Sequence, residues 1–254
     1  MLVSCITVTQ AGRLPLLRLA VADFARQTHP RRELVIVHDG DAACHAALLA
    51  LRAEHPAQSI RVELVAGPNT LGALRNVGAA AARGECVCQW DDDDRYHPQR
   101  IALQVAELAA KDADFCFLSD QLHWFPARRE LTWDDWDREP YPLNFVPGTL
   151  LGRRDALPRY PELARGEDSG ACLAILEAGG RIARLRGAGW CYTYVYHGAN
   201  VWSYAHHAAI SRVKAIGAAY LLGREMLLRE RLAEYDPPLG ALTMPYPGGQ
   251  IAFS

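Results

Sequence analysis

Short apolar runs alternate with segments of helical periodicity along the first half of the chain. In the first helical segment, Leu17, Val21 and Phe24 recur every three to four residues, which predicts one buried helix face. The apolar runs are short and rich in β-branched residues, as is typical of buried strands. Gly84 is expected to end the third helix. The expected strands are 2–8, 33–37, 60–65, 85–90 and 114–119, and the expected helices are 15–26, 44–54, 71–83 and 98–111.

This alternation predicts an α/β fold: a Rossmann-like, mostly parallel, doubly wound sheet flanked by helices. Polar or acidic residues follow three of the strands, namely Thr9, Asp39 and the run Asp91–Asp94. The carboxyl ends of parallel strands lie at one edge of a sheet, where such folds bind ligands. We therefore expect these side chains to converge on one ligand.

The alternation ends near residue 120, and the rest of the chain is expected to form a smaller mixed half and a helical C-terminal tail. No linker separates the parts, so one domain over 1–254 is expected. The elements predicted there are antiparallel segments at 123–125 and 131–136, a loop over a cleft at 134–144, a helix at 171–178, strands at 181–186 and 191–196, and a helical segment at 201–235 followed by extended residues.

Composition narrows the classes of protein that fit. The formal charge is −2, and Lys and Arg are scattered, so no basic face for nucleic acid is expected. The apolar run at the N-terminus is too short for a signal peptide, and no later window is long enough to span a membrane. The seven cysteines lie mostly in apolar runs, as in reduced cytoplasmic proteins. We therefore expect a cytoplasmic protein.

The run Asp91–Asp94 directly follows a buried strand, where four carboxylates are costly to desolvate without a cation. Hard oxygen ligands of this kind bind Mg²⁺ or Mn²⁺, often together with substrate phosphates. In an extended chain Asp91 and Asp93 would face one way and Asp92 and Asp94 the other. One pair could bind ligand, while Asp94 could cap the helix that follows.

Other candidate residues each have a structural and a functional interpretation. Asp39 before Gly40 could form a turn or bind a ligand. Arg75 could clamp a phosphate or lie on a helix surface. Asp168, after Glu167, could be a general base or a helix cap. His197 could bind a metal or phosphate, or be structural.

Five segments, in this order, resemble the inverting family 2 glycosyltransferases, which have the GT-A fold. The run from Val3 to Thr9 looks like the first strand of that family, and Glu167-Asp168 is similar to its "ED" pair. The remaining segments are Gln27–Gly40, similar to "QT.P" to "E..V.DG"; Leu71–Gly78 with Ala82–Glu85, similar to "G.A.ARN.G…A.GE"; and Gln89–Asp94, at the position of "D.DD". The chain departs from the family at Gln10-Ala11 and at His38.

The resemblance implies a role for each matched residue. Asp168 would be the general base, and Asp93, with His197 near it, would hold the metal. The residues implied to contact the nucleotide part of the donor are Thr9, Asp39 at the base, Arg75 near the diphosphate or base, and Asp91 or Asp92 at the ribose. It also implies a nucleotide-sugar-binding half over 1–120, an acceptor-side half over 121–200 and a helical extension over 201–254. The loop 133–145, with Trp124 and Trp190, would stack on a sugar or pack in the core.

The function that the resemblance implies is metal-dependent, inverting sugar transfer from a nucleotide-diphosphate donor, with a UDP-sugar favoured and Mn²⁺ or Mg²⁺ as cofactor. The acceptor would be a carbohydrate or glycolipid hydroxyl in bacterial polysaccharide or glycoconjugate synthesis. The protein would be cytoplasmic, also at the inner membrane face, and the segment from Val201 could pack on a second copy as a homodimer. The alternatives are a nucleotidyltransferase on sugar phosphates and a non-catalytic sugar-nucleotide-binding protein. A nucleotidyltransferase would want a Gly-rich phosphate loop after the first strand, where only Gly12 occurs.

Overall fold

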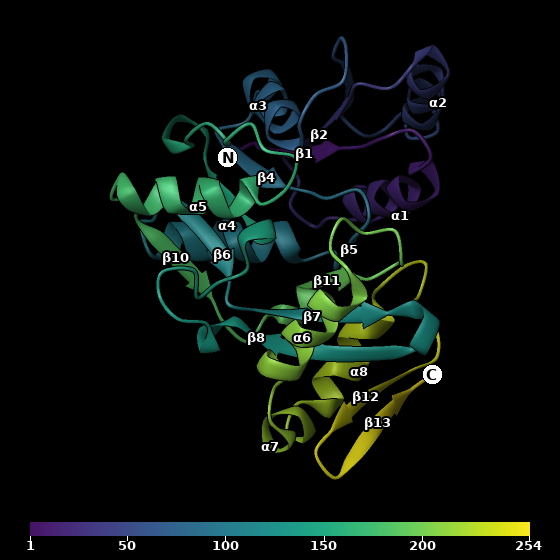
Figure 1. The fold of residues 1–254 in the computed structure, drawn as a ribbon, viewed down its shortest axis with the longest axis vertical. Helices are drawn as coiled ribbons and strands as arrows, with labels where there is room; N and C mark the ends of the chain where they lie inside the picture. Colours follow the sequence, from purple (N-terminus) through teal and green to yellow (C-terminus); the bar gives the residue numbers. More distant parts are fainter.

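The computed structural model describes residues 1–254, and its strands form two sheets (Figure 1). The first has seven strands in the order β10-β6-β9-β4-β1-β2-β3, and the second has six in the order β13-β12-β8-β7-β11-β5. The strands of the first sheet are β1 Val3–Val8, β2 Arg32–His38, β3 Ile60–Leu64, β4 Cys86–Gln89, β6 Phe115–Leu118, β9 Leu151–Arg153 and β10 Ile182–Leu185. Those of the second are β5 Arg95–Tyr96, β7 Asp120–Phe125, β8 Glu130–Asp135, β11 Tyr192–Val195, β12 Leu242–Tyr246 and β13 Gly249–Phe253.

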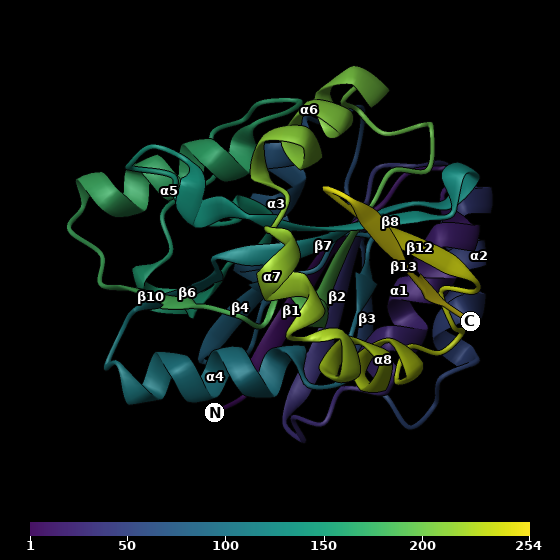
Figure 2. The ribbon, with the colours of Figure 1, turned by 90° about the horizontal axis from the view of Figure 1, so that it is seen from below.

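The first sheet is mostly parallel and is covered by helices on both faces. Strand β1 pairs in parallel with β2 and β4, and only β9 runs antiparallel, between β4 and β6. In Figure 2, α3 and α5 lie on one face of this sheet and α4 on the other. Burial on both faces explains why strands in the middle of the sheet, such as β1 and β6, are apolar runs. The helices are α1 Leu14–Ala25, α2 Ala42–Ala53, α3 Leu71–Ala81, α4 Arg100–Ala110, α5 Glu167–Glu177, α6 Tyr204–Lys214, α7 Ala218–Leu222 and α8 Glu225–Ala233.

The second sheet is mixed and is built around the antiparallel pair β7 and β8. Strand β11 joins β7 in parallel, and β5 pairs with β11 in the antiparallel sense. At the other edge, β12 and β13 form a hairpin that meets β8 through Thr243 and Glu130. The expected α/β class with a mixed second half is confirmed.

Three expectations about the elements are wrong in detail. Gly84 does not end α3: the helix ends at Ala81 with Ala82 as its C-cap, and the Gly84 N–H instead donates to Ser4 Oγ at 2.8 Å. The extension 201–254 was expected to be helical, but its helices end at Ala233 and its last residues form the β12–β13 hairpin. Helix α5 begins at Glu167, so the acidic pair lies inside its first turn.

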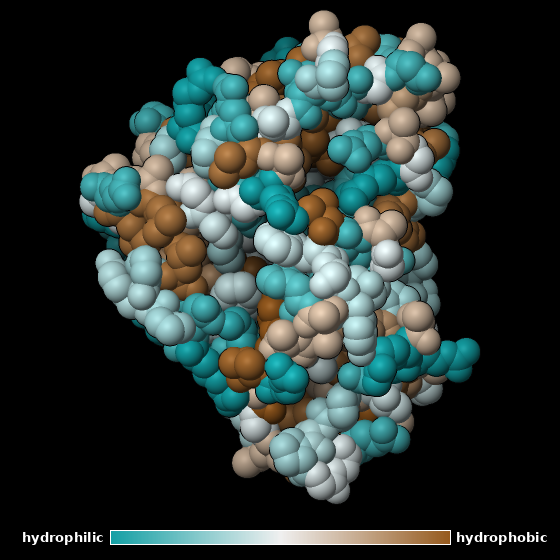
Figure 3. Space-filling model, viewed as in Figure 1, coloured by the Kyte–Doolittle hydropathy of each residue, from teal (hydrophilic) through white to brown (hydrophobic).

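Strands β9 and β10 come from the segment expected to form the acceptor side, yet they belong to the first sheet. The strands of the two sheets are therefore interleaved in sequence. The face of the molecule seen in Figure 1 mixes hydrophobic and hydrophilic residues (Figure 3). None of the helices combines the length and the apolar character that crossing a membrane requires.

Candidate active site

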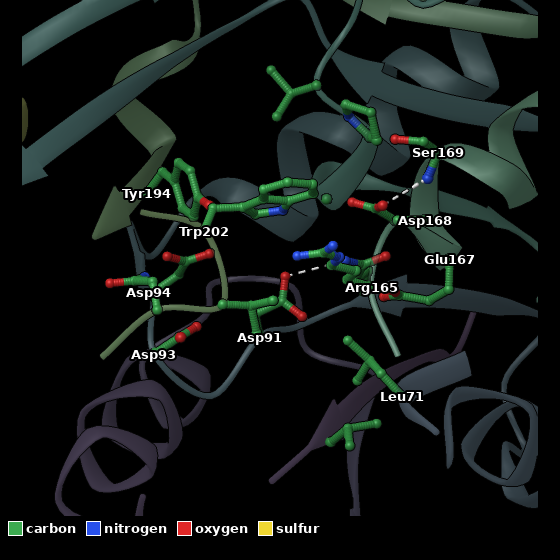
Figure 4. A pocket seen from close by; sticks show the side chains of 18 of the residues that line it. Leu71, Asp91, Asp93, Asp94, Arg165, Glu167, Asp168, Ser169, Tyr194 and Trp202 are labelled. Atoms are coloured by element: carbon green, nitrogen blue, oxygen red, sulfur yellow. Dashed lines mark hydrogen bonds between the residues drawn. The ribbon is translucent and has the colours of Figure 1, made fainter. Parts of the chain in front are cut away.

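A cavity of about 340 Å³ opens where the carboxyl ends of β1 and β4 face α5, α6 and β11. Its lining includes the whole acidic run Asp91–Asp94 together with Arg75 and Asp168. Figure 4 shows Asp93 and Asp94 on one side of this cavity and Asp168 and Ser169 on the other. The convergence expected from the strand ends is therefore present for these residues.

The acidic run is a turn and not an extended segment, so the expected alternation of its side chains is wrong. Asp91 accepts hydrogen bonds from Arg75 Nη2 at 2.7 Å and from Gln89 Nε2 at 3.1 Å. Asp92 accepts from Thr9 Oγ1 at 2.6 Å and from Arg13 Nη1 at 2.8 Å. Burial and the adjacent Asp93 charge raise the pKa of Asp92 to about 6.

Asp93 and Asp94 have different surroundings. Asp93 Oδ2 lies 3.0 Å from Arg13 Nη1 and 3.1 Å from His197 Nε2. Burial opposes ionisation of Asp93, yet His197 and Arg13 hold its pKa below the usual value. Asp94 is not the expected helix cap: it is buried and accepts from the Tyr192 hydroxyl and the Val195 N–H.

Arg13 was not anticipated from the sequence. It is the N-cap residue of α1 and forms ion pairs with both Asp92 and Asp93. A cation at a helix N-terminus is disfavoured by the helix dipole, because the exposed N–H groups there are partly positive. That unfavourable position, just after the strand end at Thr9, is the sequence signal that could have identified it.

Arg75 is buried and joins two elements that carry acidic groups. Its Nη2 contacts Asp91 at 2.7 Å, and its Nε contacts Glu167 Oε1 at 2.8 Å. Burial alone would lower the pKa of the guanidinium, but the two carboxylates hold it well above the usual value. The interpretation of Arg75 as a surface residue is therefore wrong.

Asp168 lies in the first turn of α5 and lines the cavity. Its Oδ1 accepts from the Ser169 N–H at 2.7 Å. Burial, and next the Glu167 charge, raise the pKa of Asp168 to about 6, while Arg75 acts in the opposite direction. A carboxyl group with such a pKa is suited to accept a proton near neutral pH.

Two side chains fit a divalent cation. The 3.1 Å between Asp93 Oδ2 and His197 Nε2 is close to the ~3 Å that separates neighbouring ligands of an octahedral ion with bonds of ~2.1 Å. No group of three or more His, Cys, Asp or Glu side chains is arranged to hold a metal ion. A site with few protein ligands is typical of Mg²⁺ and Mn²⁺ sites that substrate phosphates and water complete.

Thr9 and Asp39 do not line this cavity, and of the expected aromatic surface Trp136 alone does. The Thr9 hydroxyl holds Asp92, and Asp39 accepts from the Asn69 N–H at 2.6 Å in the loop before α3. Trp124, Trp133 and Trp190 are buried in the core, so their stacking on a sugar is wrong. The tryptophans that do line the cavity are Trp136 and Trp202.

The chain is similar to known proteins in sequence and in structure. A curated relative, "Uncharacterized glycosyltransferase YwdF" of Bacillus subtilis (strain 168), is 32% identical over 112 residues, which are 44% of this chain and 40% of that protein. The chain thus spans less than half the length of that relative. Staphylococcal TarS 1–349 (S. aureus) in complex with UDP-GlcNAc has a TM-score of 0.62 and 17% identity over 93% of this chain and 68% of that one.

A second solved structure has a similar fold. Mannosyltransferase PcManGT from Pyrobaculum calidifontis, in complex with GDP-Man and Mn²⁺, has a TM-score of 0.60 and 17% identity, with 92% of this chain and 73% of that chain covered. The family model "Glycosyl transferase family 2" matches residues 4–148, more than half of the chain. The GT-A fold and this match agree with the motifs in the sequence. The chain belongs to glycosyl transferase family 2.

Proposed function

We propose that this protein transfers a sugar from a nucleotide-diphosphate donor to an acceptor hydroxyl, with inversion at the anomeric carbon. The observation that carries the proposal is the position of Asp168 in the cavity wall that faces Asp93 (Figure 4). Behind the cavity lining, His197 Nε2 lies 3.1 Å from Asp93 Oδ2. An inverting transfer needs a base on the acceptor side and positive charge on the leaving-group side. The cavity offers both.

On the leaving-group side, Asp93 and His197 would hold Mn²⁺ or Mg²⁺. The ion, when bound, would act as a Lewis acid that neutralises charge on the departing diphosphate. Arg13 would add a fixed positive charge beside the same group, and the Asp91 and Asp92 carboxylates would bind the ribose. Asp39 and Arg75 remain predicted contacts of the base and the diphosphate.

On the acceptor side, Asp168 would take the proton of the attacking hydroxyl while that oxygen forms its bond to the anomeric carbon. The diphosphate leaves from the opposite face of the sugar with the electron pair of the broken bond. Glu167 and Arg75 hold the first turn of α5, and with it Asp168, against the donor half. Base catalysis of this kind is worth ~10²–10⁴ in rate.

The donor and the cellular role follow from the relatives as proposals. The similar TarS and PcManGT structures are complexes with UDP-GlcNAc and with GDP-Man, and we favour a UDP-sugar here. The acceptor would be a carbohydrate or glycolipid in bacterial polysaccharide or glycoconjugate synthesis, at the cytoplasmic side. A homodimer stays a prediction. No observation favours a nucleotidyltransferase, since one glycine, Gly12, follows β1.

The test is Asp168→Asn, with Asp155→Asn on the surface as a matched control. UDP with Mn²⁺ should stabilise both variants thermally as it does the parent. Turnover of a panel of UDP- and GDP-sugars should fall at least ~10²-fold in Asp168→Asn alone. Product anomers identified by NMR report the stereochemistry.

A folding defect is not expected to obscure this result. Because the folded-state pKa of Asp168 is raised to about 6, its ionised form destabilises the fold above that pH. The cost is absent below the unfolded pKa of about 3.9, so Asp168→Asn should melt no lower than the parent at neutral pH. Full turnover in this variant, or a retained anomeric configuration, would refute the proposed mechanism.

A further inference from the structure

A chain of buried polar side chains runs behind the cavity wall formed by β7, β11 and α6. Asp134, His123 and His207 lie on β8, β7 and α6, and all three are fully buried. His123 Nδ1 lies 3.1 Å from Asp134 Oδ2, and His123 Nε2 lies 2.9 Å from His207 Nδ1. His207 Nε2 lies 3.5 Å from the Tyr194 hydroxyl, at the long end of the hydrogen-bond range. The mechanism above uses none of these groups.

The direction of the hydrogen bonds in this chain follows from its buried end. Asp134 also accepts hydrogen bonds from the hydroxyls of Thr132 at 2.9 Å and Ser211 at 3.2 Å. A carboxylate only accepts, so His123 Nδ1 donates to it. The Ser211 oxygen also lies 3.1 Å from His123 Nδ1, and because the Ser211 proton goes to Asp134, this oxygen is an acceptor there. The Nε2 of a neutral His123 ring then accepts from His207 Nδ1–H.

The same argument gives the direction of the hydrogen bond between His207 and Tyr194, which lines the cavity. With its proton on Nδ1, a neutral His207 has a lone pair on Nε2 and accepts from the Tyr194 O–H. Burial, and next the neighbouring His123, lower the pKa of His207 to about 3, which agrees with a neutral ring. The hydroxyl proton of Tyr194 is thus directed away from the cavity, and its oxygen lone pairs are available to a ligand.

Tyr194 and a second residue face the same cavity. Tyr194 lines it together with Trp202, as Figure 4 shows. Gln121 also lines it, is 1% exposed, and its Nε2 has no hydrogen-bond partner. Gln121 lies two residues before His123 on β7, and hence on the same face of that strand. A buried donor without a partner is costly unless a ligand satisfies it.

We propose that this wall is a saccharide subsite for the acceptor, in which Tyr194 accepts a hydrogen bond from a sugar hydroxyl and the Asp134–His123–His207 chain positions it. Gln121 Nε2 donates to an oxygen of the same sugar. A wall that offers one donor, Gln121 Nε2, and one acceptor, the Tyr194 oxygen, is typical of a site for a neutral, hydroxyl-rich saccharide. The proposal rests on the proposed function, because it assigns that reaction its acceptor side.

The first experiment needs no ligand. Two-bond ¹H–¹⁵N spectra of the full chain with ¹⁵N-labelled histidine should show His123 and His207 as Nδ1–H tautomers at neutral pH. Tyr194→Phe removes the donor to His207 and should shift its Nε2 resonance, whereas His55→Gln should not. A proton on Nε2 of His207, or a charged His123 ring, would overturn the direction of the chain.

The second experiment measures saccharide binding with neutral methyl glycosides of the common hexoses, in the presence of UDP and Mn²⁺. At least one glycoside should shift the His207 Nε2 resonance. Tyr194→Phe should weaken that binding about 3- to 10-fold, as expected for one neutral hydrogen bond. His207→Gln should weaken the binding by a similar factor. The double variant with Tyr194→Phe and His207→Gln should bind no more weakly than either single variant, because both changes act on the same contact between Tyr194 and the saccharide.

Controls separate the subsite from the rest of the site. UDP with Mn²⁺ should stabilise Tyr194→Phe as much as it stabilises the parent. If UDP with Mn²⁺ does not stabilise the parent, the proposed function is contradicted and the subsite is not. Gln121→Ala should weaken glycoside binding independently of Tyr194. No glycoside response in the parent, or additive effects of the two substitutions, would overturn the proposal. If His207→Gln fails to fold, Tyr194→Phe still decides, since it leaves the buried chain intact.

Discussion

The protonation of Asp168 depends on the charges that face it. Burial raises its pKa, the carboxylates of Glu167 and Asp91 raise it further, and the Arg75 guanidinium lowers it. Glu167 accepts a hydrogen bond from Arg75 Nε, so the residue that raises the pKa of Asp168 is paired with the residue that lowers it. The pKa of about 6 is therefore a property of the group of four side chains, and changing any one of them should move it.

Substitution of Glu167 by Gln should lower the pKa of Asp168. The change removes the neighbouring negative charge, and Arg75, paired with one carboxylate fewer, then stabilises ionised Asp168 more strongly. Since Asp168, as the proposed base, must be deprotonated to act, the acid limb of the pH profile of kcat/KM should move to lower pH. Glu177→Gln at the end of the same helix is the control and should leave the limb in place. A limb that moves upward would contradict this account.

Arg13 lies between the carboxylates of Asp92 and Asp93, and Asp93 is the proposed ligand of the metal ion. Substitution of Arg13 by Gln leaves Asp92 and Asp93 without that counter-ion. Removing a charge this close to the ion site should tighten Mn²⁺ binding without nucleotide by about tenfold or more. Thermal shift against Mn²⁺ measures the change, and Asp93→Ala should abolish the response. Equal Mn²⁺ affinity in parent and Arg13→Gln would show that the two cations do not compete.

At the scale of elements, α3 is held closely against the segment that leads into α5. A Cβ at Gly72 would lie 1.9 Å from the Pro161 carbonyl oxygen, so only glycine fits there. One turn later, Asn76 donates to the Tyr160 carbonyl at 2.9 Å and accepts from the Tyr160 N–H at 2.8 Å. Arg75 lies between these contacts. The packing of α3 thus decides where its guanidinium meets the acidic groups.

Gly72→Ala should therefore act on the site through the helix. Backbone atoms must move to accept the methyl group, and overpacking of this kind typically costs about 1–3 kcal/mol. Chemical denaturation should show that loss, and UDP–Mn²⁺ binding should weaken as Arg75 moves. Gly217→Ala is the control, because nothing lies within 4 Å of its Cβ position and its φ is −67°. Equal stability of the two variants would contradict the packing argument.

The sequence predicts most elements of the first 120 residues, because strands such as β1, β4 and β6 are apolar runs and most helices have an apolar face. The two-residue strand β5 is not predicted, because it has no such run. The hairpin at the end is harder: Pro245 lies inside β12, and a proline argues against a strand. The members of the site follow from strand ends and motifs. Their partners do not, since the turn at Asp92 and the approach of Arg13 depend on tertiary contacts.

At the scale of the whole molecule, one hydrophobic cluster joins the two sheets. It includes Cys5 and Leu34 of the first sheet, and Leu122 and Met244 of the second. The hairpin that follows the helices contributes Ile251 and Phe253 to the same cluster, so it belongs to the core. The sheets should consequently unfold together.

Met244→Ala should destabilise both sheets. Met244 is fully buried, and truncating a buried methionine costs about 2–5 kcal/mol through lost burial and the cavity left behind. Met226, 78% exposed on α8, is the matched control, and Met226→Ala should change stability by less than about 0.5 kcal/mol. Urea denaturation followed by tryptophan fluorescence measures both. Two separate transitions in Met244→Ala would show that the sheets are not one cooperative unit.

The position of β9 between β4 and β6 has a consequence for the time course of synthesis. A ribosome makes β4 and β6 first, and the strand that pairs with both follows about thirty residues after β6. Until it emerges, the nascent chain presents unpaired strand edges, which are the surfaces most prone to pair with another chain. The strands of this sheet are synthesised in a different order from the one in which they lie side by side. We therefore expect chaperones to bind the nascent chain before β9 is made.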